Sequence, residues 1–202
     1  MGRLNLAVFV SGRGSNMQAL MEACADLSFP AQISVVLSNC PDAAALDKAR
    51  AAHIPAIVVD HTLYKTKAEF EVAIQAALAP YPVDLICLAG FMRLLSADFI
   101  AGWPDKIINI HPSLLPAYKG LDTHARVLAD GGTQSGCTVH FVRPAMDDGP
   151  TIVQRAVPVL QGDTPDHLAA RIMVQEHVAY VEAVRLIAEK RIRIINERVE
   201  IL

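Results

Sequence analysis

The sequence predicts an α/β fold: an open, mostly parallel twisted sheet of about seven strands with helices on both faces. Continuous apolar runs at residues 4–10 and 83–88 are typical of strands that are covered on both faces. Segments with helical periodicity alternate with such runs, and this order favours parallel strands joined by right-handed crossovers. With 202 residues, of which 52% are hydrophobic, the chain can bury a substantial core. We therefore expect residues 1–202 to form a single domain.

The first half of the chain supplies most of the expected parallel strands. The strand at residues 4–10 ends in a glycine-rich turn. The helix that follows carries its apolar residues on one face, at Met17, Leu20, Met21 and Cys24. Further along, the apolar runs predict strands at residues 33–37, 56–59 and 83–88, and the periodic segments predict helices at residues 42–52 and 67–79.

The second half begins with a β-branched strand at residues 107–111. Pro112 stops this strand because proline has no N–H to donate to a ladder. Two later strands are joined by a connection too short for a parallel crossover, so we expect them to pair antiparallel. The elements expected after the first strand are a short helix at 123–129, strands at 137–142 and 152–159, a long helix from Pro165 to about residue 190 with Thr164 as its N-cap, and an edge strand or hairpin at 191–202.

The composition argues against several classes of function. Charged residues make up 19% of the chain, the formal net charge is -3, and no basic stripe is present, so we expect no nucleic-acid partner. The apolar runs are too short to span a membrane and no signal peptide is recognisable, which favours a cytoplasmic protein without a membrane partner. The 4 cysteines are scattered without metal-ligand spacing, so we expect reduced thiols and no bound metal. The sequence does not decide between a monomer and a homodimer.

Candidate catalytic residues lie at the carboxyl end of the strand at residues 107–111. Asn109 and His111 are two residues apart, so their side chains project from the same side of the strand. In an open α/β sheet, ligands bind outside the carboxyl ends of the strands, where an amide and an imidazole can act together. Alternatively, these side chains only satisfy the backbone of the following loop. The remaining histidines are interpreted mainly as surface or core residues, namely His53, His61, His124, His140, His167 and His177.

The turn after the first strand is a candidate anion site. Gly14, Ser15 and Asn16 stand between a strand and a helix, so backbone N–H groups and the positive end of the helix converge there. The turn lacks the Lys-Ser/Thr pair of a Walker A loop, and Met17 replaces the third glycine of the dinucleotide fingerprint. Both differences favour a single phosphate monoester as the ligand. Alternatively, Gly12 and Gly14 only make a tight turn.

Two further segments carry candidate ligand contacts. The apolar loop at residues 89–95 follows a strand and can line a pocket for a flat ring, although such residues are more often part of the core. On the long helix, Glu176 falls on the same stripe as Leu168, Ile172 and Tyr180. An inward carboxylate must be paired, either with an amine or hydroxyl of a ligand or with an arginine of the protein.

Several motifs, in matching order and spacing, resemble those of the folate-dependent formyltransferases. They cover nearly the whole chain, at Gly14-Ser15-Asn16, Ala89-Gly90-Phe91-Met92-Arg93, Asn109-x-His111-Pro112-Ser113-Leu114-Leu115-Pro116, Asp147-x-Gly149-Pro150 and Gln175-Glu176-His177. The resemblance implies a Rossmann-like formyltransferase fold. It also implies transfer of a formyl group from the co-substrate 10-formyltetrahydrofolate to the amine of glycinamide ribonucleotide in de novo purine biosynthesis. Branches of the family that act on methionyl-tRNA or hydrolyse the folate carry an additional domain, for which we expect no room.

The resemblance also assigns roles to individual residues. It implies that Asn109, His111 and Asp147 are catalytic, with Asp147 holding His111 in its charged form. The positions implied for the ribonucleotide are Gly14, Ser15, Asn16, Met173, Gln175 and Glu176. The positions implied for the folate are Lys67, Met92, Arg93, Leu94, Leu95, Asn109, Arg143, Pro144, Ala145, Met146 and Asp147. By the same resemblance we expect a nucleotide- and phosphate-binding half at 1–100, a catalytic and folate-binding half at 101–202, and a cis peptide bond between Leu115 and Pro116.

Some positions depart from the family pattern. Asp148 adds a carboxylate beside Asp147 where a glycine or alanine is usual, Lys67 stands where an arginine is expected, and Ala117 and Lys119 vary the loop after the strand. Two other functions also stay open: hydrolysis of formyltetrahydrofolate, and a nucleotide-sensing or NAD-dependent module. The phosphate loop argues against the hydrolase, which would not need it. The missing third glycine and the lack of a clear ribose-binding acid argue against the dinucleotide module.

Overall fold

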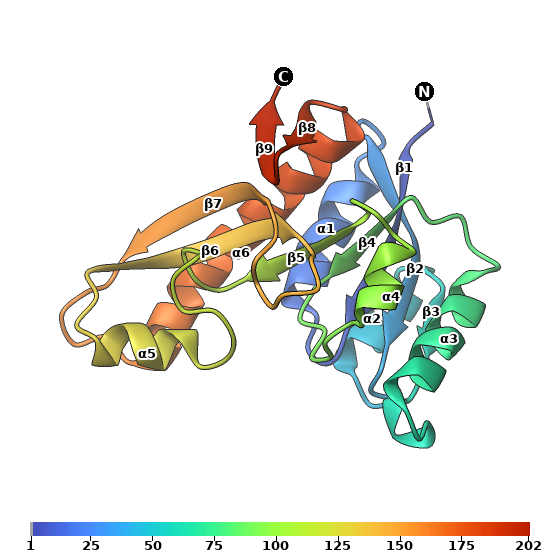
Figure 1. Cartoon of the computed structure of the whole chain (residues 1–202), viewed down its shortest axis with the longest axis horizontal. Helices are drawn as coiled ribbons and strands as arrows, with labels where there is room; N and C mark the ends of the chain where they lie inside the picture. The colour runs from blue at the N-terminus through green and yellow to red at the C-terminus, as the bar shows by residue number, and fades with distance from the viewer. Residues whose placement is uncertain (1) are drawn as a thin grey trace. The chain divides into compact units, whose positions relative to one another are not determined.

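The structure is a computed structural model that describes residues 2–202 and contains two compact units, one ending at Ile108 and one beginning at Asn109 (Figure 1). The first unit contains β1 (Leu4–Val10), α1 (Ser15–Ala25), β2 (Ala31–Ser38), α2 (Ala44–Ala51), β3 (Ala56–Val58), the 3-10 helix η1 (His61–Leu63), α3 (Lys67–Leu78), β4 (Leu85–Leu88) and α4 (Ala97–Ala101). β5 (Ile107–His111) crosses the boundary. The second unit contains α5 (Thr123–Ala129), β6 (Gln134–Phe141), β7 (Thr151–Pro158), α6 (Pro165–Ala188), β8 (Ile192–Ile195) and β9 (Arg198–Ile201).

Strands β1 to β7 follow the order β3-β2-β1-β4-β5-β6-β7 in one 7-stranded sheet, and β8 and β9 form a separate hairpin. In the first unit, β1 pairs in parallel with β2 and β4, and β2 pairs in parallel with β3. In the second unit, β6 and β7 are antiparallel. The mostly parallel α/β sheet predicted from the sequence is therefore confirmed, together with the antiparallel pair that the short connection requires.

Each unit has its own core. In the first, β1 is completely buried from Leu6 to Val10, which explains its continuous apolar sequence. In the second, α6 packs against β6 and β7, and it buries Leu168, Ile172 and Tyr180 completely. Burying an aliphatic side chain such as that of Leu168 or Ile172 stabilises a fold by about 1.5–3 kcal/mol. Glu176 lies on the same stripe of α6 but is only half-buried.

Capping residues in the sequence predict the start of the long helix but did not reveal the short ones. α6 begins as predicted, with Pro165 at its start and the Thr164 hydroxyl accepting from the His167 N–H at 3.3 Å. The short helices η1 and α4 were not predicted. α4 has a similar cap, in which the Ser96 hydroxyl accepts from the Phe99 N–H at 3.1 Å. Both helices contain too few residues to show a helical period.

The largest boundary difference concerns β6, which was predicted at residues 137–142 and begins at Gln134 instead. The strand continues through polar residues because β7 supplies a backbone partner along its whole length, from Gln134 opposite Pro158 onward. Gly136 is required in this pair, since a Cβ there would lie 2.1 Å from the Arg155 carbonyl oxygen. Pairing with a neighbouring strand, which hydrophobicity does not record, thus extends β6 toward its N-terminus.

Two smaller predictions are also confirmed. The tail forms a hairpin of β8 and β9, with Ile192 opposite Ile201. The peptide bond between Leu115 and Pro116 is cis. Within residues 2–202, no helix combines the length and the apolar character needed to cross a membrane.

Candidate active site

β5 delivers two polar side chains to its carboxyl end. His111 is the last residue of the strand and is 6% exposed, and Asn109 is half-buried. The strand stops because Pro112 follows it. The chain then turns at once, and the Ser113 N–H donates to the His111 carbonyl at 2.9 Å. The backbone of His111 is therefore held from both sides, by the sheet and by the turn.

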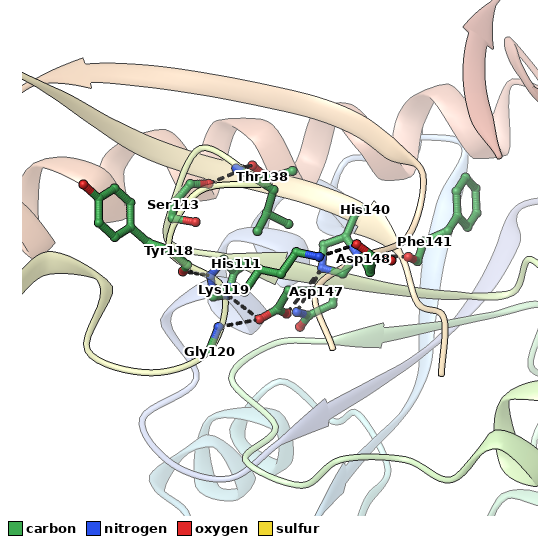
Figure 2. A network of polar contacts seen from close by, with 12 residues as sticks. His111, Ser113, Tyr118, Lys119, Gly120, Thr138, His140, Phe141, Asp147 and Asp148 are labelled. Atoms are coloured by element: carbon green, nitrogen blue, oxygen red, sulfur yellow. Dashed lines mark hydrogen bonds and ion pairs between the residues drawn. The ribbon is translucent and has the colours of Figure 1, made fainter. Parts of the chain in front are cut away.

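Thr138 of β6 fixes the loop that follows His111 (Figure 2). Its hydroxyl donates to the Ser113 carbonyl at 2.7 Å and accepts from the Leu115 N–H at 3.1 Å. The side-chain amide of Gln154, on β7, donates to the same hydroxyl at 2.9 Å and to the Leu115 carbonyl at 3.0 Å. The hydroxyl thus uses its one donor and both acceptor positions, and Thr138 is completely buried. A fully satisfied, buried group of this kind makes the loop rigid.

Asp147 is the carboxylate that faces His111. Its backbone has φ 51°, a left-handed conformation that Asp tolerates better than most residues. One carboxylate oxygen, Oδ2, accepts from the Gly120 N–H at 2.9 Å and lies 3.5 Å from His111 Nδ1. The other, Oδ1, lies 3.8 Å from His140 Nε2. The side chain of Asp147 is only 10% exposed, so it is a largely buried carboxylate between two imidazoles (Figure 2).

Both ring nitrogens of His111 face oxygen atoms. Nε2 lies 2.9 Å from the Tyr118 carbonyl oxygen, which can only accept, so this nitrogen is the donor of that bond. Nδ1 faces the carboxylate of Asp147, at 3.5 Å from Oδ2. The ring is therefore oriented between a backbone carbonyl and a carboxylate.

His140 belongs to this site, although the sequence suggested only a surface or core residue. It is indeed in the core, at 2% exposure, and burial lowers its pKa below the usual value for histidine. Its Nδ1 donates to the Phe141 carbonyl at 2.9 Å, which leaves Nε2 of the neutral ring as an acceptor. The Asn109 Nδ2 lies 3.4 Å from that Nε2. His140 thus orients the amide of Asn109 and leaves the second N–H of Nδ2 available.

The additional carboxylate of Asp148 does not face the imidazoles. It forms an ion pair with Lys119, a residue of the loop that also varies from the family pattern. The side chain of Asp148 is 56% exposed and that of Lys119 is 34% exposed, so the pair contributes at most about 1 kcal/mol to stability. Lys119 and Asp148, the two residues that depart from the family pattern here, therefore neutralise each other's charge.

The glycine-rich turn of the first unit borders a cavity of about 250 Å³. Gly14 has φ 68° and directly precedes α1. The Ser11 hydroxyl closes one side, donating to Asn39 Oδ1 at 2.5 Å and accepting from the Met92 N–H at 2.8 Å. The cavity is lined by Ser11, Gly12, Arg13, Gly14, Ser15, Asn16, Ala89, Gly90 and Met92. The residues predicted to bind an anion therefore line a concave pocket at a helix N-terminus, and the loop after β4 forms part of its wall.

The other residues singled out in the sequence occupy varied positions. Arg143 is bound by Glu197, which precedes β9, at 2.7 Å. Glu176 lies close enough to Cys137 to act on it: burial, and then the charge of Glu176, raise the pKa of the Cys137 thiol to about 12. Of the remaining positions, Leu95 is buried, Gln175 is half-buried, and the exposed ones are Lys67, Arg93, Leu94, Pro144, Ala145, Met146 and Met173.

Comparison with known proteins decides the family. Residues 4–184 match the profile of the family described as formyl transferase. The chain belongs to the formyl transferase family. Phosphoribosylglycinamide formyltransferase of Escherichia coli is 37% identical over 190 residues, which cover 94% of this chain and 90% of that protein. The crystal structure of glycinamide ribonucleotide transformylase 1 from Symbiobacterium toebii has a TM-score of 0.96 and 44% identity, and the match covers 99% of this chain and 94% of the other.

The family also occurs as part of longer proteins. The trifunctional purine biosynthetic protein adenosine-3 of Bos taurus is 46% identical to this formyl transferase over 192 residues, or 95% of this chain. The match covers 19% of the bovine protein, so the chain spans about a fifth of the length of that relative. The resemblance to formyltransferases seen in the motifs is thus confirmed over nearly the whole sequence.

The loop that carries Asp147 in this formyl transferase depends on Gly149. A Cβ at this position would lie 1.8 Å from the Phe141 carbonyl oxygen, a backbone atom that cannot move aside without opening the end of β6. We expect Gly149→Ala to lower the free energy of unfolding by about 1–3 kcal/mol, the usual cost of overpacking. Gly12→Ala is the control, because no atom lies within 4 Å of its Cβ position. Urea denaturation of both variants tests this, and equal midpoints would show that the turn relaxes freely.

Proposed function

We propose that the protein transfers the formyl group of 10-formyltetrahydrofolate to the amine of glycinamide ribonucleotide, giving formylglycinamide ribonucleotide and tetrahydrofolate in purine biosynthesis. The observation that carries the proposal is the cluster of Asn109, His111 and Asp147 in a formyl transferase chain. The relatives named above as phosphoribosylglycinamide formyltransferase and glycinamide ribonucleotide transformylase support the choice of substrates.

The reaction sets a clear electrostatic task. The primary amine attacks the formyl carbon on N10 of the folate, and the planar carbonyl becomes a tetrahedral oxyanion. A new C–N bond then remains, the bond to N10 breaks, the attacking nitrogen loses a proton, and N10 gains one. The groups near the reacting carbon must therefore stabilise a negative charge and move a proton.

Asn109 and His111 are suited to the oxyanion. The amide of Asn109 is oriented by His140 and keeps one N–H for the substrate. Both ring nitrogens of His111 face protein oxygens, so this residue contributes a positive charge near the oxyanion and not a free N–H. A preorganised donor such as the Asn109 amide is worth about 3–4 kcal/mol of transition-state stabilisation at an acyl-transfer site. Asp147 keeps His111 cationic and relays the proton from the amine toward N10, directly or through water.

We further propose how the substrates are divided among the residues. Gly14, Ser15 and Asn16 hold the phosphate, and the positions on α6 contact the rest of the ribonucleotide, at Met173, Gln175 and Glu176. The folate is proposed to contact Lys67, Met92, Arg93, Leu94, Leu95, Asn109, Arg143, Pro144, Ala145, Met146 and Asp147. A single cytoplasmic domain that uses no metal, nucleic acid or membrane, and that exists as a monomer or homodimer, completes the proposal.

A transfer assay tests the function. The purified protein is mixed with 10-formyltetrahydrofolate, with and without glycinamide ribonucleotide, and formation of tetrahydrofolate is followed spectroscopically while mass spectrometry identifies the formylated product. We expect turnover that depends on the acceptor. Release of formate at the same rate without the acceptor would instead identify a hydrolase, and binding of NAD but of no folate analogue would favour a dinucleotide module.

A further inference from the structure

Helix α2 holds the glycine-rich turn by two hydrogen bonds to consecutive carbonyl groups. The Ala45 N–H donates to the Gly12 carbonyl at 3.1 Å. The Lys48 ammonium donates to the Arg13 carbonyl at 2.8 Å. The contact is also tight, because a Cβ on Gly14 would lie 2.6 Å from the Ala45 Cβ. The first turns of α2 therefore act as the support against which this loop is shaped.

The two bonds also set the direction of the N–H groups in the loop. In a planar trans peptide the C=O of one residue and the N–H of the next point in opposite directions. Since the carbonyls of Gly12 and Arg13 point to α2, the N–H groups of Arg13 and Gly14 point away from it. Within residues 2–202, neither N–H donates to another backbone or side-chain group. Both are thus free to donate to an anion in the cavity that these residues line.

Two cations accompany these N–H groups. Arg13 is exposed and lines the cavity, and Lys48 reaches the backbone of the same turn. Among the described residues, neither has an ion pair. The acidic side chain of α2, Asp47, is bound to Arg50 at 2.9 Å. In a chain with a formal net charge of -3, this concentration of unpaired positive charge favours a dianion.

We propose that Lys48 is a positioning residue and Arg13 a direct contact for the phosphate monoester of the acceptor, and that together they make the enzyme selective for a phosphorylated amine. The inference rests on the proposed function. Lys48 fixes the peptide planes so that their N–H groups face the phosphate. Arg13 adds a guanidinium whose fork matches two phosphate oxygens.

The test compares acceptors on matched variants. Lys48→Met removes the ammonium, Lys48→Arg keeps a donor and a charge, Arg13→Met removes the guanidinium, and Arg50→Met is a control that removes one cation from the same helix. For each protein, kcat/KM is measured with glycinamide ribonucleotide and with its dephosphorylated form. We expect Lys48→Met and Arg13→Met each to lower the ratio of kcat/KM for glycinamide ribonucleotide to kcat/KM for the dephosphorylated acceptor about tenfold. A change of this size corresponds to the loss of one charge-assisted bond. Lys48→Arg and Arg50→Met should stay within about threefold of the wild type.

The outcomes separate the two proposals. A wild type that does not formylate glycinamide ribonucleotide refutes the proposed function. A wild type that does, with an unchanged ratio in both methionine variants, refutes the inference alone. An equal fall of the ratio in Arg50→Met also refutes the inference, because the net charge of the protein would then explain the preference for the phosphorylated acceptor. If Lys48→Met does not fold, Lys48→Gln takes its place, because it also removes the ammonium and should lower the ratio in the same way. Arg13→Met is expected to fold, because Arg13 is exposed.

Discussion

Asp147→Asn should lower kcat for formyl transfer about a thousand-fold, as expected when a general acid–base group and its charge are both lost. The affinity for a folate analogue should change by only a few-fold, because the carboxylate acts on His111 and on the proton path. Its Oδ2 lies 3.5 Å from His111 Nδ1, and an amide cannot hold the imidazolium there by charge. Steady-state kinetics and equilibrium binding of the analogue measure the two effects separately.

The substitution is suited to this purpose because it preserves the fold of the loop. Asn tolerates the left-handed backbone of residue 147 as well as Asp does. Its side-chain oxygen can still accept from the Gly120 N–H, as the carboxylate does at 2.9 Å. An equal loss of turnover and of folate affinity would indicate a displaced loop. In that case, the assignment of Asp147 to the chemical step would have to be abandoned.

A double mutant examines whether Asp147 acts through His111. If the two residues form one unit, adding Asp147→Asn to His111→Asn should cost far less than it costs in the wild type. Fully additive losses would separate the two roles and leave the 3.5 Å contact without a catalytic meaning.

The fold could be predicted mainly where local chemistry determines it. β1 is recognisable because it is buried on both faces, and α6 because Thr164 and Pro165 mark its start. The two strand-end residues Asn109 and His111 were found because a proline stops their strand. In each case the deciding interactions lie within a few residues of sequence.

The rest of the site depends on neighbours that lie far apart in the sequence. His140 contacts Asn109, 31 positions away, and a histidine within an apolar strand gives no sign of such a partner. The spacing along β6 was the one usable signal for His140. Side chains two residues apart on a strand face the same side, so His140 shares a face with Thr138, the residue that fixes the loop after His111. The pairing of Asp148 with Lys119 was hidden for the same reason. Such contacts follow from strand order and loop closure, which periodicity does not encode.

Gly14→Val should suppress transfer to glycinamide ribonucleotide by about a hundred-fold or more, an effect of the size that misplacing a substrate by an ångström has on orientation. Gly14 has φ 68°, a conformation that a β-branched residue rarely adopts. Its Cβ would also lie 2.6 Å from the Ala45 Cβ and 3.3 Å from the Met17 Cε. The turn must therefore shift, and its N–H groups would no longer converge on the phosphate.

The loss of activity in Gly14→Val should depend on whether the acceptor carries a phosphate. Remote binding energy at the phosphate is used to place the amine beside the formyl carbon, so a displaced loop should reduce kcat/KM for the phosphorylated acceptor and change little for the dephosphorylated one. Affinity for a folate analogue should survive, and Asn16→Leu should behave like Gly14→Val because a bulky side chain blocks close approach of the phosphate. Equal use of both acceptors by the wild type would remove the phosphate assignment and reopen the hydrolase interpretation.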